Sequence, residues 1–345
     1  MIIRIIPMAT GLGDLIRHEP LIRGIKEKYP DSVIYLNCFD LEKEGILKGT
    51  SVEFQQILCY RSDLLINLHR HYEDYKFMYE KKDTWKELIG YTSVTTGTFQ
   101  EAVDEWIYVS DLEHVYPKEL IERRKKVPAK NLSQRMCEIT GIFPADKRIH
   151  YYVTDEEKQW AKGFVKNVNK PIVYLHPCSE GNKNKPKTTN ISDDEWGELK
   201  EWSPFEAFKS LINSRDIFLE IFKQLIKLNK EFHFVAIGAP KDKSQLDYLE
   251  EEENCTVSIS GLRKNLSLLT VADWFIGVDS GPSHVAYALD VPSLVLYVGL
   301  FKHGSVPVEP KVNHIMYSKD VLTVKRITVE DVHEQFKKLR ELNVH

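Results

Sequence analysis

Residues 274–298 read WFIGVDSGPSHVAYALDVPSLVLYV, and this stretch decides the fold class. An apolar run at 274–278 ends in a turn of small residues, and an almost wholly apolar run follows at 291–298. Short apolar runs of this kind are typical of strands that are buried on both faces of a parallel sheet. The stretch therefore predicts a strand, a turn, a helix and a second strand of an α/β protein.

The same alternation of strands and helices continues along the chain. Short apolar runs predict further strands at residues 2–6, 32–36, 64–68, 149–153, 172–175, 232–237 and 256–259. Periodic apolar residues predict helices at 14–29, at 131–142 with Gly141 at its end, and from Thr328 with a capping-box spacing to Asp331. We expect an α/β fold of two Rossmann-like parallel-sheet domains that face a central cleft. The expected ranges are 1–160, 168–325 and, for a final helix, 328–343.

The composition is that of a globular chain without a strong charge. The chain has 345 residues, of which 42% are hydrophobic and 28% charged, and its net charge is −4. This length is enough for two domains with a core each. The acidic balance gives no general attraction to nucleic acid or to an anionic membrane. We expect the local basic run at 123–126 to be a solvated helix end.

Cysteine usage and the N-terminus predict a cytoplasmic protein. The five cysteines are scattered without a C-x-x-C spacing, so neither a zinc site nor a redox pair is predicted. Free thiols fit a reducing compartment. The N-terminal apolar run is too short for a signal peptide, and no run reaches the length of a membrane-spanning helix. Any membrane contact is expected to be peripheral, at the inner membrane face.

Two turns that follow strands are candidates for binding an anion. Gly11-Leu12-Gly13-Asp14 lies between a strand and a helix, where backbone N–H groups suit phosphate. The dinucleotide fingerprint fails because Ile16 stands where its third glycine would be, and no P-loop pattern occurs. From spacing alone, an N-cap role for Asp14 is favoured over a catalytic one. The turn at 279–284 is equally readable as a small-residue diphosphate platform or as an ordinary capped turn.

Three further features have a functional and a structural interpretation. Lys200 precedes Trp202 and a helix start, so it either neutralises phosphate or is a solvated lysine. His69 and His71 have a spacing that permits metal binding, but without a third ligand no metal site is predicted. The absence of Asp-x-Asp argues against glycosyltransferases that hold their donor through a divalent metal. The polar stretch 180–192 is expected to be a long surface loop, and 69–98 loops and short helices.

Segments along most of the chain resemble glycosyltransferase family 9, the ADP-heptose:lipopolysaccharide heptosyltransferases. They occur in the family's order: GLGDLIRHEPLIRGIKEKYPDSVIYL at 11–36, DLLINLH at 63–69, LHPCS at 175–179, FVAIGAPKDK at 234–243 and LSLLTVADWFIGVDSGPSHVAYALDVPSLVLYVG at 266–299. The last segment is the most specific, because it is similar to the family's donor-site signature over its whole length. The resemblance implies the GT-B fold, inversion at the anomeric carbon, and no metal or other cofactor.

The resemblance also implies roles for individual residues. Asp14 would be the general base, since an inverting transfer needs one carboxylate to take the acceptor proton. The donor, a nucleotide sugar such as ADP-heptose, would be bound in the C-terminal domain by Asp279, Ser280, Gly281, His284, Lys200 and, more weakly, Asp242. Lys200 would neutralise the leaving diphosphate in place of a metal. The acceptor would lie against the N-terminal domain at Gly13, Arg17 and His18.

The chain departs from the family pattern in two places that concern substrates. Arg17-His18-Glu19 replaces the small or polar residues that usually precede the proline of that helix, and one residue is inserted in the motif that contains Lys200. The acceptor is expected to be a saccharide or glycolipid. The alternatives are the same chemistry on a protein hydroxyl or a nucleic-acid base, or a non-catalytic nucleotide-sugar-binding module. The presence of both Asp14 and the 279–284 turn argues against a pure binding module.

Overall fold

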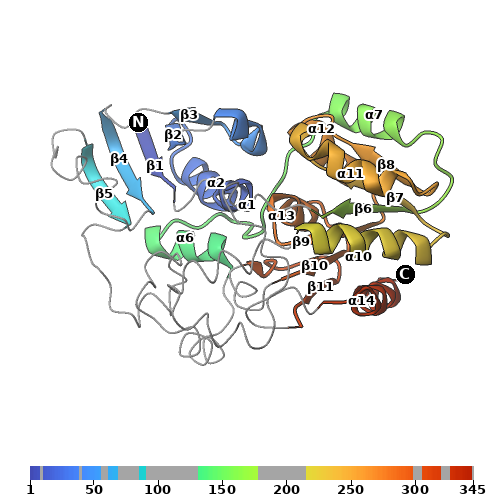
Figure 1. The fold of residues 1–345 in the computed structure, drawn as a ribbon. Coiled ribbons are helices and arrows are strands. Elements are labelled where there is room, and N and C mark those ends of the chain that lie inside the picture. The colour runs from blue at the N-terminus through green and yellow to red at the C-terminus, as the bar shows by residue number, and fades with distance from the viewer. Residues whose placement is uncertain are drawn as a thin grey trace, which may run out of the picture.

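The protein consists of two halves, each built on a parallel sheet (Figure 1). The computed structural model describes residues 1–7, 11–38, 41–55, 61–68, 85–90, 131–177, 215–297, 305–319 and 327–343. Several sequence-based predictions fall outside these residues: Lys200, the pair His69 and His71, the stretches 69–84, 91–98 and 180–192, and the basic run 123–126.

The first sheet has the order β3-β2-β1-β4-β5, with all strands parallel. Its strands are β1 (Ile2–Ile6), β2 (Val33–Asn37), β3 (Val52–Gln55), β4 (Ser62–Asn67) and β5 (Trp85–Gly90). The helical elements of this half are α1 (Leu12–Arg17), α2 (Glu19–Lys28), the 3₁₀ segment η1 (Leu41–Leu47) and α6 (Leu132–Thr140). Helix α6 begins at Asn131, whose side chain accepts from Ser133 N–H, and ends at Gly141 with a left-handed φ of 67°.

The second sheet has the order β11-β10-β9-β6-β7-β8 and is also wholly parallel. Its strands are β6 (Ile172–His176), β7 (His233–Ile237), β8 (Cys255–Ser258), β9 (Trp274–Val278), β10 (Ser293–Leu296) and β11 (His314–Tyr317). Its helical elements are α7 (Asp155–Phe164), α10 (Arg215–Leu228), η4 (Pro240–Asp242), α11 (Lys243–Glu250), α12 (Leu262–Ser267), η5 (Leu268–Val271), α13 (Gly281–Ala288) and α14 (Val329–Leu342). The predicted capping box of Thr328 and Asp331 is present at the start of α14.

Three strands were not predicted, and one predicted strand is absent. The missed strands β3, β5 and β11 are three of the four edge strands of the described sheets; the fourth, β8, was predicted at 256–259. Edge strands have fewer covering neighbours, so sequences such as VEFQ and HIMY lack the continuous apolar run that identifies a central strand. Residues 149–153, predicted as a strand, are extended chain without a ladder partner. They connect the two halves, and this explains their apolar character.

The helix predicted at 14–29 is divided at His18 into α1 and α2. His18 N–H bonds to Leu15 O, which closes α1. Pro20 then lies in the first turn of α2, a position where its missing N–H has no helical acceptor to lose. Apolar periodicity continues through the break, so it gave no sign of this division.

The two halves meet where α1 and α13 lie side by side (Figure 1). A Cβ atom on Gly281 would stand 2.8 Å from Leu12 Cβ, and one on Gly13 would stand 3.1 Å from His284 Cδ2. Both glycines are therefore required by the close approach of two helix starts. The chain crosses between the halves before α7, because α7 packs on α12 and η5 of the second half.

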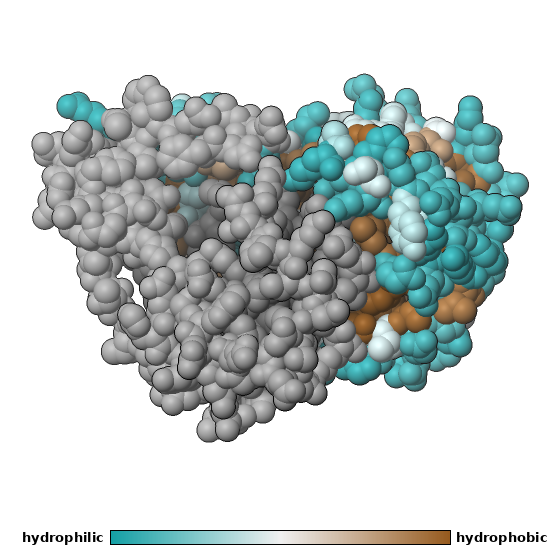
Figure 2. Space-filling view, viewed as in Figure 1, coloured by the Kyte–Doolittle hydropathy of each residue, from teal (hydrophilic) through white to brown (hydrophobic). Residues whose placement is uncertain are grey.

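One apolar core continues across the junction between the halves. The cluster that contains Ile3 and Leu15 of the first half also contains Tyr174, Phe275 and Val285 of the second. A separate cluster covers the other face of the second sheet, beneath α10 and α14. The coloured surface of the second half is mainly hydrophilic, with small hydrophobic areas (Figure 2). Within the described ranges, no helix has the length and apolar character needed to cross a membrane.

Candidate functional site

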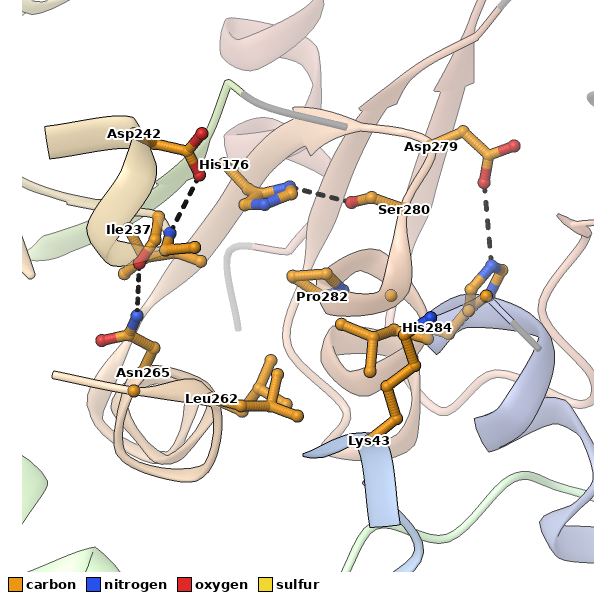
Figure 3. A pocket seen from close by; sticks show the side chains of 18 of the residues that line it. Lys43, His176, Ile237, Asp242, Leu262, Asn265, Asp279, Ser280, Pro282 and His284 are labelled. Carbon is orange, nitrogen blue, oxygen red and sulfur yellow. Dashed lines mark hydrogen bonds and ion pairs between the residues drawn. The ribbon is translucent and has the colours of Figure 1, made fainter. Parts of the chain in front are cut away.

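A cavity of about 670 Å³ lies between the two halves. Its floor in the second half is formed by the carboxyl ends of β6 and β9, adjacent strands from which the chain proceeds in opposite directions across the sheet. Such a switch point is where open parallel sheets bind ligands. The turn at 11–14 and Arg17 close the cavity from the first half, together with Lys43 (Figure 3). Its volume is in the range of sites for small organic ligands.

The turn after β9 is held in place by a histidine at the end of β6. Ser280 Oγ donates to Val278 O at 3.0 Å and lies 2.8 Å from His176 Nδ1 (Figure 3). Because the single hydroxyl proton goes to the carbonyl, His176 Nδ1 donates to Ser280 Oγ. The Ser280 backbone is extended, with φ −169°, so the chain enters α13 sharply.

The first turn of α13 exposes fewer amides than the sequence suggested. Pro282 has no N–H, and Ser283 N–H bonds to Ser280 O at 3.1 Å. Of these first three residues of the helix, only Gly281 can offer its N–H to a ligand. The structure therefore confirms the capped helix start, while the diphosphate platform stays a prediction that rests on one open amide at a helix N-terminus.

Asp14 faces the turn at 279–284 from the other half of the molecule. It lies in the first turn of α1, and its Oδ1 accepts from Arg17 Nη1 at 3.2 Å. The N-cap position is Gly11, which makes no side-chain cap. The predicted N-cap role of Asp14 is therefore wrong, because the helix begins two residues before it. Its side chain is 23% exposed and borders the cavity.

Arg17 connects this carboxylate to the second half. Its Nη2 donates to Ser305 Oγ at 2.6 Å and lies 2.6 Å from His284 Nε2 and 4.0 Å from Asp279 Oδ1. Ser305 Oγ in turn donates to Asp279 Oδ1 at 3.2 Å. One guanidinium group therefore bonds to Asp14 and approaches Asp279, two of the three acidic residues that line the cavity.

The histidine and the carboxylate of the second half have shifted pKa values. Burial lowers the pKa of His284 well below its usual range, and the Arg17 charge lowers it further, so the ring is neutral. Burial raises the pKa of Asp279 to about 6, a rise that Asp14 supports and that Arg17 and the Ser305 hydrogen bond oppose. A carboxyl group in this state changes its charge close to neutral pH.

The far end of the cavity is formed by the residues that follow β7. Asp242 is buried and accepts from Ala239 N–H at 3.0 Å, so its carboxylate caps the short η4 segment. Asn265 donates to Gly238 O at 2.9 Å (Figure 3). Leu262 and these polar groups together line a region with both apolar and hydrogen-bonding character.

Most of the predicted site residues within the described ranges line this cavity. They are Gly13, Asp14, Arg17, Asp242, Asp279, Ser280, Gly281 and His284. His18 does not: its ring is fully buried, bonded to Asp14 O at 2.8 Å, and burial lowers its pKa to about 4. Glu19 is also fully buried, in an ion pair with Arg23 at 2.8 Å. Of the unusual Arg17-His18-Glu19 segment, only Arg17 reaches the cavity.

Several lining residues were not predicted as part of the site. His176 ends a predicted strand and could have been found from its place at the carboxyl end of that strand. Lys43 and Asn265 lie outside the quoted segments, Lys241 lies in the 234–243 segment without a predicted role, and only the tertiary fold brings all three to the cavity. Ser305, the relay between Arg17 and Asp279, also lies outside any pattern. Within the part of the chain that the structure describes, no group of three or more His, Cys, Asp or Glu side chains could hold a metal ion.

A family model matches the second half of the chain. Residues 216–326 match glycosyltransferase family 9 (heptosyltransferase). This range contains Asp242 and the whole 279–284 turn, but it does not reach back to Asp14. No curated protein sequence matches the chain.

Solved structures with a similar fold cover nearly the whole chain. E. coli ADP-heptose LPS heptosyltransferase II has a TM-score of 0.57 at 15% identity, over 98% of each chain. E. coli heptosyltransferase WaaC with ADP-2-deoxy-2-fluoro heptose has a TM-score of 0.56 at 13% identity, over 98% of this chain and 99% of that one. The dodecameric iron-containing heptosyltransferase TibC of E. coli, in complex with ADP-D-beta-D-heptose, has a TM-score of 0.52 at 12% identity, over 99% and 76%.

At these identities the structural likeness shows the fold, which is GT-B, and the family model covers residues 216–326 of the second half. Both findings agree with the order of segments in the sequence. The chain is therefore similar to the family 9 heptosyltransferases: it has their GT-B fold, and residues 216–326 match their family model.

Proposed function

We propose that the protein is an inverting glycosyltransferase that moves a sugar from a nucleotide-sugar donor to a hydroxyl group of a saccharide or glycolipid. One observation carries this proposal: Asp14 of the first half and the turn at 279–284 of the second line one cavity and are joined through Arg17. An inverting transfer needs this arrangement, because a carboxylate must take the proton of the acceptor hydroxyl as that oxygen bonds to the anomeric carbon and the nucleotide diphosphate leaves from the opposite face.

The second half would bind the donor. The Gly281 amide and the Ser280 side chain would contact the diphosphate, and the region around Leu262 and Asn265 would receive the nucleoside. WaaC and TibC, which share the fold, are described with ADP-linked heptoses. We therefore propose an ADP-linked sugar, with heptose as the first candidate. Asp242 would act through η4, since its carboxylate is occupied by Ala239 N–H.

Asp14 would act as the general base. Its carboxylate borders the cavity and receives a hydrogen bond from Arg17 on Oδ1, which restrains its orientation. An acceptor hydroxyl that enters from the first half would approach this group before it reached the donor loop. General-base catalysis by such a carboxylate contributes about 10²–10⁴-fold to a rate.

Cationic side chains would offset the charge of the leaving diphosphate. Lys43 and Lys241 line the cavity, and Lys200 remains a further candidate from the sequence. Fixed cations aimed at a leaving group stabilise the charge that develops on it. We propose that the reaction needs no metal or other cofactor. TibC, with the same fold, is iron-containing, so the proposal requires a direct test.

A thermal-shift screen of nucleotides and nucleotide sugars tests the donor class. A donor at a hundredfold excess over its Kd stabilises the folded protein by about 2.7 kcal/mol. We expect ADP and ADP-linked sugars to raise the melting temperature more than UDP-, GDP- or CMP-linked sugars, and to do so equally with and without EDTA. A response to another nucleotide would change the donor, and a shift lost in EDTA would overturn metal independence. The absence of any nucleotide response would contradict the proposed function itself.

A further inference from the structure

Arg17 is the buried residue through which the two halves of the cavity contact each other. Its Nη1 binds Asp14 of its own helix, and its Nη2 reaches His284 and Ser305 of the second half. His284 and Ser305 are almost completely buried, and so is Arg17. These bonds join positions that are 267 and 288 residues apart in the chain. A planar guanidinium group with several fixed donors can hold such partners at once, whereas an ammonium group is a single point charge.

The contact with Arg17 decides the tautomer of His284. Arginine has donors only and stays protonated, so His284 Nε2 must accept from Nη2 across 2.6 Å. In the neutral ring the proton then lies on Nδ1. That atom is buried and has no hydrogen-bond partner among the residues that the structure describes. A buried Nδ1 proton without an acceptor is unfavourable, so the hydrogen bond that Arg17 donates to Nε2 must offset this cost. That hydrogen bond therefore helps to fix the orientation of the His284 ring.

Arg17 also separates two carboxylates that come from different halves. Asp14 Oδ1 lies 3.2 Å from Nη1 and Asp279 Oδ1 lies 4.0 Å from Nη2. Without the guanidinium group, these acidic side chains would face each other across the cavity with no charge between them. Asp279 would also lose the Ser305 hydroxyl as an oriented donor, because Arg17 holds that oxygen at 2.6 Å.

We propose that Arg17 is a positioning residue that couples the base to the donor loop: it orients Asp14 and holds His284 as a neutral acceptor at Nε2, so that both turns form one unit. The inference rests on the proposed function for the meaning of "base" and "donor", but its geometric content does not. In this arrangement His284 supports Arg17 and does not itself donate from Nε2 to the diphosphate. Movement of either turn would misplace the other.

The first arm of the test needs no substrate. In the full-length protein labelled with ¹⁵N-histidine, we expect the His284 ring, assigned with His284→Gln, to show a protonated Nδ1 and an unprotonated Nε2. In Arg17→Met the ring should lose this state and protonate Nε2. Arg135→Met is the matched control, because Arg135 also pairs with an acid one helix turn away, Glu138 at 3.3 Å, but outside the cavity. A protonated Nε2 in the wild-type protein would overturn the proposal without any variant.

The second arm measures transfer. A displacement of about 1 Å in a reacting group can cost about 100-fold in rate, so we expect Arg17→Lys to lower kcat by about 10- to 100-fold while the donor KM changes less than about three-fold. Guanidinium at millimolar concentration should restore part of the rate of Arg17→Ala and none of the rate of Asp14→Asn. Wild-type kcat in Arg17→Lys would overturn the coupling. A wild-type protein that transfers no sugar would contradict the proposed function, while the ring spectrum would still decide the role of Arg17.

Discussion

The turn at 11–14 and the turn at 279–284 have the same local design and different positions for their acid. Both follow a central parallel strand, contain glycine and open a helix. In the first, Asp14 is already inside the helix, and its carboxylate is paired with Arg17 one turn later. In the second, Asp279 precedes the N-cap residue Ser280, and burial raises the pKa of its side chain to about 6.

This difference teaches how one motif can serve two roles. The orientation of an acidic side chain within a helix is determined by the helix and by the residue at i+3. A fixed orientation suits a group that must take the proton of an acceptor hydroxyl. An acid before the helix belongs to the loop, so its direction depends on tertiary contacts, here with Ser305 and Arg17. The two turns approach so closely that Gly13 and Gly281 cannot carry side chains without displacement. Chemistry is thus proposed for the first turn and donor binding for the second.

If the first turn carries the chemistry, Asp14→Asn should have the largest effect. We expect kcat to fall about 10²–10⁴-fold, because the amide keeps the shape of the side chain but cannot take a proton. Donor affinity, measured by titration calorimetry, should stay nearly unchanged. Asp155→Asn is the control, since Asp155 is an exposed acid in the first turn of α7. Unchanged turnover in Asp14→Asn would show that Asp14 is not the general base, and would contradict the proposed division of roles between the two turns.

The close approach of the turns can be tested with Gly281→Ala. The added methyl group would stand 2.8 Å from Leu12 Cβ, so the halves must move apart. Overpacking of this kind costs about 1–3 kcal/mol in the free energy of unfolding, which urea denaturation measures. Gly163→Ala is the matched control, because a Cβ there meets no atom within 4 Å and alanine suits a helix better. Equal stability of both variants would mean that the turns tolerate separation.

The different state of Asp279 predicts a smaller, pH-dependent effect. Its pKa is raised from an ordinary value of 3.8 to about 6, so the folded protein holds this proton more tightly than the unfolded chain does. The group therefore stabilises the fold least above pH 6, and stability is lost as the pH rises between these two values. The Asp279→Asn variant should not show this loss, so it should be more stable than the wild type at pH 7. We expect a difference of only about 1 kcal/mol, because solvent reaches 30% of the side chain and weakens the effect.

Urea unfolding of both proteins between pH 4 and pH 8 measures that difference, with Asp247→Asn as a control at an exposed acid on α11. We expect the stability gap between Asp279→Asn and the wild type to widen as the pH rises from 4 to about 6 and to stay constant above that pH. A gap that does not change with pH would show that Asp279 is ionised throughout, like an ordinary surface carboxylate.

Local rules were enough for much of the fold and for the two turns. The apolar runs located the central strands, Gly141 ended its helix with a positive φ, and Thr328 capped the last one. These features depend on residues within a few positions of each other, so the sequence contains the whole cause. The edge strands β5 and β11 could not be found in this way, because they are defined by pairing with a neighbour rather than by their own pattern.

By itself the sequence determined the parallel α/β architecture, the position of both turns and the likeness to a glycosyltransferase family. Only the tertiary structure decided that Arg17 enters the cavity while His18 and Glu19 are buried, and that His284 accepts from Arg17. The physical reason is distance along the chain. The periodicity of a helix predicts which residues share a face, but it does not predict which distant residues pack against that face. Charge pairing and tautomer depend on contacts between halves that join only when the chain has folded.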